Sequence, residues 1–181
     1  LMASAAKAIR DTNPDIRIAV HYTNPEAQKY GHYAATLDVY GVDYDVFATS
    51  YYPFWHGTLG NLKAQLQAVI DRSGKKVMIA ETSYAYTLQD TDGSGNSIGE
   101  QLTYEKPYPF TVQGQARELS DVIQAMADLG SSAIGVFYWE PAWITVPGET
   151  HSEKSALWEA NGAGWASSCA ADYDPDDADV Y

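Results

Sequence analysis

A carboxylate that follows a short apolar run is the feature of the sequence that says most about chemistry. Residues Val77–Ala80 are apolar and follow a polar segment that ends at Gly74, a pattern that predicts a buried parallel strand rather than an amphipathic helix. Glu81 comes next. The residues at the C-terminal ends of β/α-barrel strands face the active site, so a Glu here predicts carboxylate chemistry on an oxygen-rich substrate with apolar faces, such as a sugar. The alternative is a solvated Glu in a loop.

Three other predicted strands end in side chains that suit the same kind of substrate. They are His21 and Tyr22 after the first strand, Tyr51, Tyr52, Trp55 and His56 after the second, and Trp139, Glu140 and Trp143 after the last. Sugar rings stack their C–H faces on aromatic side chains, and their hydroxyl groups need partners such as His, Glu and Tyr. Four consecutive strand ends of this type favour the carbohydrate site over the solvated loop.

The two carboxylates among these residues, Glu81 and Glu140, are candidates for glycoside hydrolysis. A retaining glycosidase needs two carboxyl groups about 5–5.5 Å apart, one to attack the sugar and one to protonate the leaving oxygen. Glu81, held ionised by a Tyr of the neighbouring strand, suits the nucleophile. Glu140 follows an adjacent strand and could be the partner by geometry alone, or it could bind a sugar hydroxyl.

The hydrophobic pattern predicts strands that alternate with helices. The predicted strands are 16–22, 45–50, 77–80 and 133–138, and the predicted helices are 1–10, 25–40 with an interruption at Gly31, 59–73 between Thr58 and Gly74, and 119–129 closed by Gly130. This order predicts an α/β fold with a parallel sheet, equal to half of a β/α barrel. A doubly wound sheet fits the same order, but the sequence has no Gly-x-Gly-x-x-Gly turn or phosphate loop to favour it.

The composition excludes several classes of partner. The chain has 24 acidic and 11 basic residues and a net charge of -13, which repels nucleic acid and anionic membranes. Cys169 is the only cysteine, so a disulfide within the chain is impossible and a thiolate metal site is not expected. The sequence has no apolar run of about 18 residues that could span a membrane, and its first residues do not form a signal-peptide pattern.

Six motifs resemble glycoside hydrolase family 53, the endo-β-1,4-galactanases that act on galactan and type I arabinogalactan. They are Ala-Val-His-Tyr-Thr-Asn-Pro at 19–25, Ser-Tyr-Tyr-Pro-Phe-Trp-His-Gly-Thr-Leu at 50–59, Ile-Ala-Glu-Thr-Ser-Tyr at 79–84, Thr-Val-Gln-Gly-Gln at 111–115, Tyr-Trp-Glu-Pro-Ala-Trp at 138–143 and Gly-Trp-Ala-Ser-Ser at 164–168. The resemblance implies a parallel (β/α)8 TIM-barrel glycosidase. This chain, residues 1–181, would be the C-terminal half of that single catalytic domain, roughly strands 5–8 with their helices, truncated at both ends.

The resemblance also implies roles for individual residues. Glu81 matches the family's nucleophile, and the acid/base Glu belongs to a strand that would precede Leu1, so the chain alone is expected to be inactive. Glu140 is then a sugar or structural contact rather than the acid. Trp139 would form the floor of the subsite at the cleaved bond, Trp165 would be a more distal stacking platform, and Tyr51 or Tyr52 would orient Glu81. A polymeric galactan substrate implies a secreted or cell-surface location.

The loop after the Glu81 strand is a candidate calcium site. Oxygen-bearing side chains occur at every second position, at Asp90, Asp92, Ser94 and Asn96, and a tight turn at Gly95 could point them at one hard cation. The EF-hand pattern fits in part, because its final Glu is replaced here by Gln101. A solvated loop is the alternative, but bacterial family members with a structural Ca²⁺ in this loop favour the metal.

Two other functions fit the same residues. One is a non-catalytic carbohydrate-binding protein on the same scaffold, although binding alone does not require a carboxylate at Glu81. The other is a barrel glycosidase for a different β-linked polysaccharide. A half-barrel also leaves two sheet edges and an open core, so we expect it to associate with the missing N-terminal half or with a second copy.

Overall fold

The computed structural model describes residues 1–88, 98, 107–139, 153 and 156. The chain divides into two compact units, one drawn from residues 1–83, 104–107 and 116–139 and the other from 84–103, 108–115 and 140–181. All four strands belong to the first unit. In the second, the Tyr84 ring stacks on Phe110 with 5.6 Å between ring centroids, and its hydroxyl donates to the Tyr108 carbonyl at 2.6 Å. No helix among the described residues is long and apolar enough to cross a membrane.

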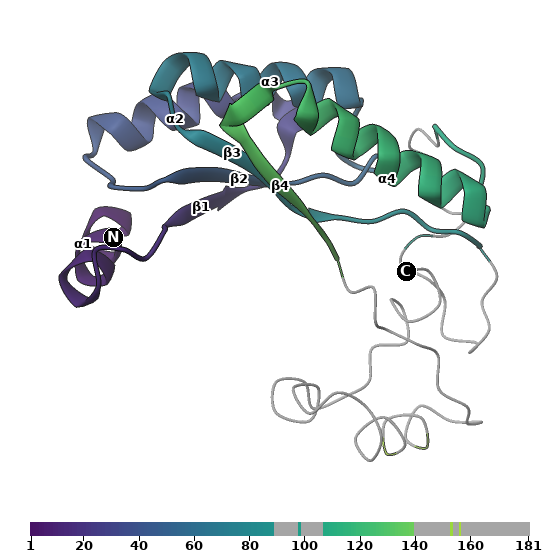
Figure 1. Cartoon of the computed structure of the whole chain (residues 1–181), viewed down its shortest axis with the longest axis horizontal. Helices are drawn as coiled ribbons and strands as arrows, with labels where there is room; N and C mark the ends of the chain where they lie inside the picture. Colours follow the sequence, from purple (N-terminus) through teal and green to yellow (C-terminus); the bar gives the residue numbers. More distant parts are fainter. Residues whose placement is uncertain (89–97, 99–106, 140–152, 154–155, 157–181) are drawn as a thin grey trace. The chain divides into compact units, whose positions relative to one another are not determined.

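The first unit contains a parallel four-stranded sheet, as the sequence predicts (Figure 1). Its strands are β1 (Ala19–Tyr22), β2 (Val46–Ser50), β3 (Lys76–Thr82) and β4 (Ala133–Tyr138), and they lie in the order β1-β2-β3-β4. Each strand pairs with the next one along the chain, through a helical crossover. The bounds of β4 match the prediction, and β3 extends beyond it to include Glu81.

The first strand is shorter than predicted, because side chains hold the residues before it. The Ile18 amide donates to Asp45 Oδ2 at 2.7 Å, and the Arg10 guanidinium donates to the Ile16 carbonyl. Arg10 also pairs with Asp45 at 2.9 Å and with Asp43 at 2.8 Å. These bonds tie the end of the first helix to the entry of β2, and the strand begins only at Ala19.

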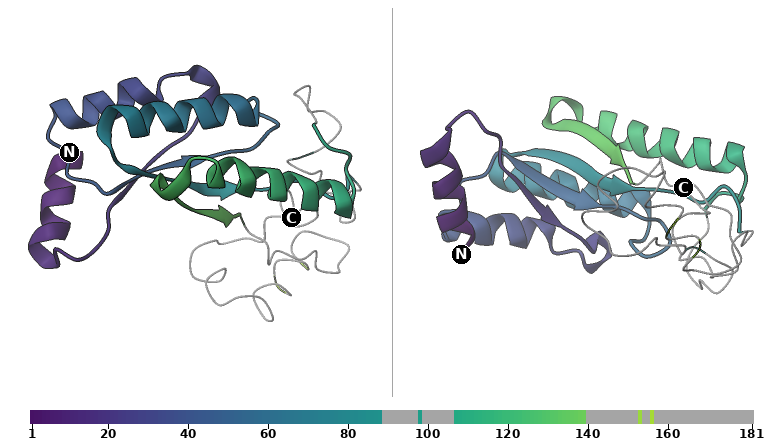
Figure 2. Two further views of the ribbon diagram at one scale, coloured as in Figure 1. Left: turned by 45° about the horizontal axis from the view of Figure 1, so that its top comes forward. Right: turned by 90° about the horizontal axis from the view of Figure 1, so that it is seen from below.

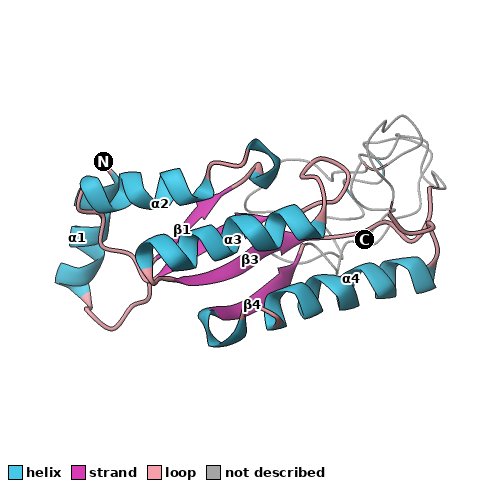
Figure 3. Ribbon diagram, turned by 90° about the horizontal axis from the view of Figure 1, so that it is seen from above, coloured by secondary structure: helices cyan, strands magenta, loops and turns pink. Residues whose placement is uncertain are grey.

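Three helices lie on one face of the sheet (Figure 3). After α1 (Met2–Thr12), they are α2 (Tyr30–Val39), α3 (Leu59–Ser73) and α4 (Val112–Ala127), with short 3₁₀ turns η1 (Pro25–Ala27) and η2 (Gly130–Ser132). Figure 2 shows the α2–α3 layer from two further directions. The core between this layer and the sheet contains Val20, Phe47, Val77 and Ile79 from the strands and Tyr30, Leu37, Leu62, Leu66, Val69, Val122 and Met126 from the helices.

The predicted helix 25–40 is wrong in its start and in the role given to Gly31. The segment opens as the separate turn η1, flanked by Asn24 and Gln28 in the left-handed region, and α2 begins only at Tyr30. Gly31 lies inside α2 and does not interrupt it. A Cβ atom there would be 3.4 Å from Ala68 Cβ, so this glycine permits close packing of α2 against α3.

The ends of α3 are those that the sequence predicts. Thr58 Oγ1 accepts from the Asn61 amide at 3.2 Å, and Gly74, at φ +66°, donates its amide to the Ile70 carbonyl at 2.8 Å. The fourth helix differs from its prediction because it begins at Val112, seven residues before 119, and ends at Ala127. Gly130 follows as the first residue of η2.

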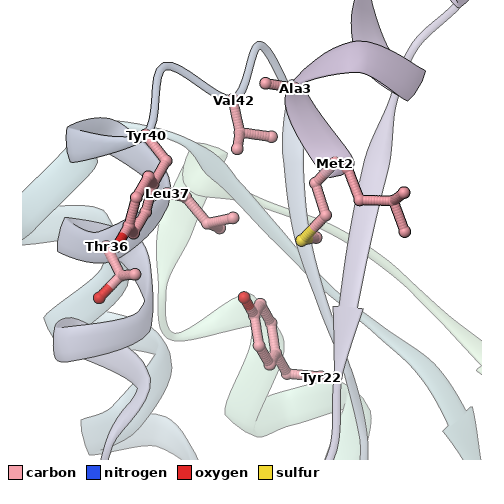
Figure 4. A pocket seen from close by; sticks show the side chains of 8 residues that line it. Met2, Ala3, Tyr22, Thr36, Leu37, Tyr40 and Val42 are labelled. Carbon is pink, nitrogen blue, oxygen red and sulfur yellow. The ribbon is translucent and has the colours of Figure 1, made fainter.

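Apolar side chains are exposed near both outer strands of the described sheet. A pocket of about 310 Å³ lies between α1, β1 and α2, and its lining includes Met2, Tyr22, Leu37, Tyr40 and Val42 (Figure 4). On β4, the side chains of Ile134 and Phe137 remain 48% and 62% exposed. Within the described residues, neither edge strand of the sheet is paired with a further strand.

One acidic side chain among the described residues is buried in the helical layer. Glu118 of α4 is 0% exposed, and within the described part of the chain neither of its carboxyl oxygens has a hydrogen-bond partner. Burial, and to a smaller extent the charge of Asp121, raise the pKa of Glu118 to about 8 from an ordinary value of 4.5. At neutral pH the folded protein therefore holds a proton that the unfolded chain releases.

This proton makes stability depend on pH. The contribution of Glu118 is fully present below pH 4.5 and is lost as the pH rises towards 8, at no more than about 1.4 kcal/mol per pH unit. We expect Glu118→Gln to remove this loss. The difference in free energy of unfolding, variant minus parent, should therefore be more positive at pH 8 than at pH 5. Urea unfolding at both pH values measures the difference, with the exposed Asp15→Asn as the control. An equal effect of Glu118→Gln at both pH values would contradict the assignment.

Candidate active site at the C-terminal ends of the strands

The pairing of β2 with β3 changes at the point where the polar residues begin. Phe47 is opposite Val77 and Thr49 is opposite Ile79, but Ser50 is opposite Glu81, so β3 contains one extra residue at this step. Bulges of this kind redirect a side chain and are common beside active sites.

The bulge decides which face of the sheet Glu81 occupies. Phe47 and Thr49 face the helices, because both contact Tyr30 of α2, and Ser50 therefore points to the opposite face. Strict alternation from Ile79 would turn Glu81 towards the helices. The extra residue instead places its carboxylate beside the Ser50 hydroxyl.

The carboxylate of Glu81 is held on one of its two oxygens. Ser50 Oγ donates to Oε2 at 3.1 Å, and Tyr52 OH donates to the same atom at 3.3 Å. His21, at the end of β1, places Nδ1 3.9 Å from Oε1 and Nε2 2.9 Å from Ser50 Oγ. The side chains of Glu81 and His21 remain 27% and 37% exposed, so a ligand can reach the carboxylate.

The structure distinguishes the two tyrosines that the sequence leaves equivalent. Tyr52 donates to Glu81, whereas the Tyr51 hydroxyl donates to the Gly57 carbonyl at 3.1 Å and so supports the loop after β2. Both rings are buried. Trp55 packs its ring against Tyr52 in an edge-on arrangement, with 5.6 Å between ring centroids.

His56 fixes the position of Tyr52. Its Nδ1 accepts from the Tyr52 amide at 3.0 Å, so the proton of the neutral ring is on Nε2, which lies 3.2 Å from Thr23 Oγ1. The ring is only 7% exposed, and burial lowers the pKa of His56 below 6.5 despite the charges of Glu26 and Glu81. A neutral His56 therefore connects the loops after β1 and β2.

The described part of the site also includes the end of β4. The Trp139 amide donates to the Thr82 carbonyl at 2.9 Å, and its side chain is 38% exposed, as suits a stacking surface. Seven predicted site residues lie outside the described residues, namely the predicted sugar contacts Glu140, Trp143 and Trp165 and the predicted calcium ligands Asp90, Asp92, Ser94 and Asn96.

Sequence reasoning missed two polar residues of the site. The hydrophobic pattern indicates Ser50 only as the last residue of a strand, although its position two residues before Tyr52 places both at the same end of β2. Thr23 is indicated only as part of a motif. Alternation along β2 could have found Ser50, whereas the contact of Thr23 with His56 depends on two loops that only the fold brings together.

Comparison with known proteins relates this chain to one family. Residues 1–175 match the sequence profile of glycosyl hydrolase family 53. The chain is 55% identical to the endo-β-1,4-galactanase of Bacillus subtilis (strain 168), over 98% of this chain and 42% of the relative. It is 33% identical to the arabinogalactan endo-β-1,4-galactanase of Cellvibrio japonicus (strain Ueda107), over 88% of this chain and 43% of the relative. The chain thus spans about two fifths of the length of these relatives.

Solved structures show the same relationship in the fold. The family 53 catalytic domain of Ignisphaera aggregans superposes with a TM-score of 0.75 at 38% identity, over 81% of this chain and 41% of that domain. A psychrophilic family 10 endo-β-1,4-xylanase superposes with a TM-score of 0.54 at 10% identity, over 75% of this chain and 39% of the xylanase, a likeness that shows the fold alone. The four parallel strands and their helices therefore match part of a TIM barrel.

The state of His56 can be tested by titration. Burial opposes the charged ring, and protonation of Nδ1 would break its bond from the Tyr52 amide. We expect His56 to titrate below 6.5 and to carry its neutral-state proton on Nε2, as followed by NMR of the imidazole nitrogens against pH. The stability that depends on neutral His56 is then lost as the pH falls through and below 6.5. A ring that titrates above 6.5 would show that the surrounding carboxylates outweigh burial.

Proposed function

The chain belongs to glycosyl hydrolase family 53, and we propose that it supplies the nucleophile of an endo-β-1,4-galactanase. The observation that supports this most directly is the Glu81 carboxylate, held by two hydroxyl donors at a strand end and still partly exposed. The substrate class comes from the Bacillus subtilis relative, whose name specifies β-1,4-galactan.

In the proposed reaction, a Glu81 oxygen attacks the anomeric carbon of a galactose unit. The bond from that carbon to the glycosidic oxygen breaks, the oxygen leaves with the electron pair, and it takes a proton from the acid. Water then attacks the anomeric carbon of the resulting glycosyl ester, the bond from that carbon to the Glu81 oxygen breaks and the carboxylate leaves with the electron pair, and the same acid group, now a base, accepts a proton from the water. The product retains the configuration of the substrate, because the anomeric carbon is inverted twice.

The residues around Glu81 have distinct parts in this scheme. Tyr52 donates a hydrogen bond to Oε2 and so holds the carboxylate in place before attack. The exposed Trp139 ring offers a stacking face for the sugar at the end of β4. We propose that the acid/base carboxyl comes from the part of the family 53 barrel that this chain does not span, and that Glu140 contacts sugar.

A non-catalytic sugar-binding protein is the second candidate, since exposed aromatic rings alone would support binding. The arrangement around Glu81 favours catalysis, because two donors on one carboxylate oxygen are more than a simple sugar contact requires. A barrel glycosidase with another β-linked substrate is the third, and comparison of galactan with xylan as substrates separates it from the first.

Replacement of the proposed nucleophile tests the function. In the natural protein that contains this chain, Glu81→Gln should abolish the release of reducing sugar from linear β-1,4-galactan, because an amide cannot form the glycosyl ester. Galactan binding, measured by calorimetry, should persist. Asp38→Asn, which removes one charge from an exposed position on α2, should leave hydrolysis unchanged.

The other outcomes separate the candidates. Hydrolysis that survives Glu81→Gln would overturn the nucleophile assignment. Binding without hydrolysis in the unchanged protein would favour the non-catalytic protein, and release of sugar from xylan but not from galactan would favour the third candidate.

A further inference from the structure

We propose that Ser50 is a positioning residue that selects Oε1 of Glu81 as the attacking atom and sets the tautomer of His21. The proposal rests on the function proposed for Glu81. It concerns a hydroxyl group that lies between two other polar groups of the site, 2.9 Å from His21 Nε2 and 3.1 Å from Glu81 Oε2.

The number of protons on Ser50 fixes the direction of both hydrogen bonds. An ionised carboxylate only accepts hydrogen bonds, and a serine hydroxyl has one proton to donate. Ser50 gives that proton to Glu81 Oε2, so its oxygen must accept from His21. His21 Nε2 therefore carries a proton in the neutral as well as in the charged ring.

The same bonds make the two oxygens of Glu81 unequal. Oε2 accepts from both Ser50 and Tyr52, which leaves its lone pairs engaged. Within the described residues, the polar neighbour of Oε1 is His21 Nδ1 at 3.9 Å, beyond hydrogen-bond distance. In the neutral tautomer set by Ser50, this nitrogen bears no proton and does not compete with a sugar for Oε1.

The arrangement depends on the bulge in β3. Ser50 reaches Glu81 only because the extra residue places them opposite each other on one face. Thr49, the residue before Ser50, points to the other face, where its hydroxyl contacts Tyr30 OH at 2.6 Å. Thr49 Oγ1 also donates to the Ser50 carbonyl at 2.9 Å, but neither of these two bonds reaches Glu81 or His21, so Thr49 supplies a control on the same strand.

Kinetics of two variants test the positioning role. In the natural protein, we expect Ser50→Ala to lower kcat on β-1,4-galactan about tenfold or more, the size expected for loss of a hydrogen bond to a charged group. KM should change less than about twofold, because Ser50 is only 5% exposed and offers little surface to a sugar. Thr49→Val removes a hydroxyl from the same strand, and it should lower the melting temperature while kcat changes less than about twofold. An unchanged kcat in Ser50→Ala, or an equal loss of kcat in Thr49→Val, would overturn the proposal.

A spectroscopic measurement tests the tautomer without any variant or activity. We expect the ¹⁵N spectrum of neutral His21, assigned with His21→Gln, to show the proton on Nε2. In Ser50→Ala the Nε2 proton loses its acceptor, and we expect the form with the proton on Nδ1, facing Glu81, to gain population. A neutral His21 protonated on Nδ1 in the unchanged protein would overturn the proposal, because Ser50 would then donate to His21 instead of Glu81.

These readouts distinguish failure of the inference from failure of the proposed function. If the protein hydrolyses galactan and loses activity in Glu81→Gln while Ser50→Ala has no effect, that result would support the proposed function and overturn the positioning role of Ser50. A protein without galactanase activity that still shows the Nε2 tautomer, lost in Ser50→Ala, has the hydrogen-bonded arrangement but another function.

Discussion

The register between β2 and β3 is the constraint on which the site depends. Side chains of a strand alternate between two faces, so a shift of one residue moves every later side chain to the other face. Before the bulge, Val77 and Ile79 pack into the helical core, and after it Glu81 points to the opposite face beside Ser50. One extra residue therefore lets β3 pack into the core for most of its length and present the proposed nucleophile at its end.

The helical side of the sheet supports this geometry through Tyr30. Its hydroxyl lies 2.6 Å from Thr49 Oγ1, its ring packs on Phe47, and Tyr22 stacks between Phe47 and Tyr33 at 5.0 and 4.9 Å. Buried aromatic rings with a satisfied hydroxyl are rigid contacts. They hold the helical face of β2 against α2, whereas Ser50, on the opposite face of the same strand, contacts Glu81 and His21.

Sequence reasoning was most successful where the signal is local. The bounds of β4 and both ends of α3 follow from an apolar run, from Thr58 as a cap and from Gly74 at positive φ. The prediction of a helix over 25–40 was wrong at its start, because the chain first forms the separate turn η1. It was also wrong about Gly31, which does not interrupt the helix but permits close packing against Ala68. The aromatic and acidic residues at the strand ends were found, but the choice of Tyr52 over Tyr51 required the directions of their hydroxyls. A bulge leaves no such local signal, so sequence could not place Ser50 against Glu81.

The stability of the sheet and the proposed catalysis both require strands beyond the four of the described sheet. A closed barrel has no edge strands, whereas β1 and β4 lie at the edges of the described sheet and expose apolar groups such as Phe137. The retaining hydrolysis proposed for this site in turn needs a second carboxyl group about 5–5.5 Å from Glu81. Relatives that are more than twice as long as this chain have enough residues to supply both, given that it covers 42% of the Bacillus subtilis protein. Strands that pair with β1 and β4 would cover the apolar edges, and their C-terminal ends would face the same opening as Glu81. Closure of the sheet and completion of the carboxyl pair would then be one event.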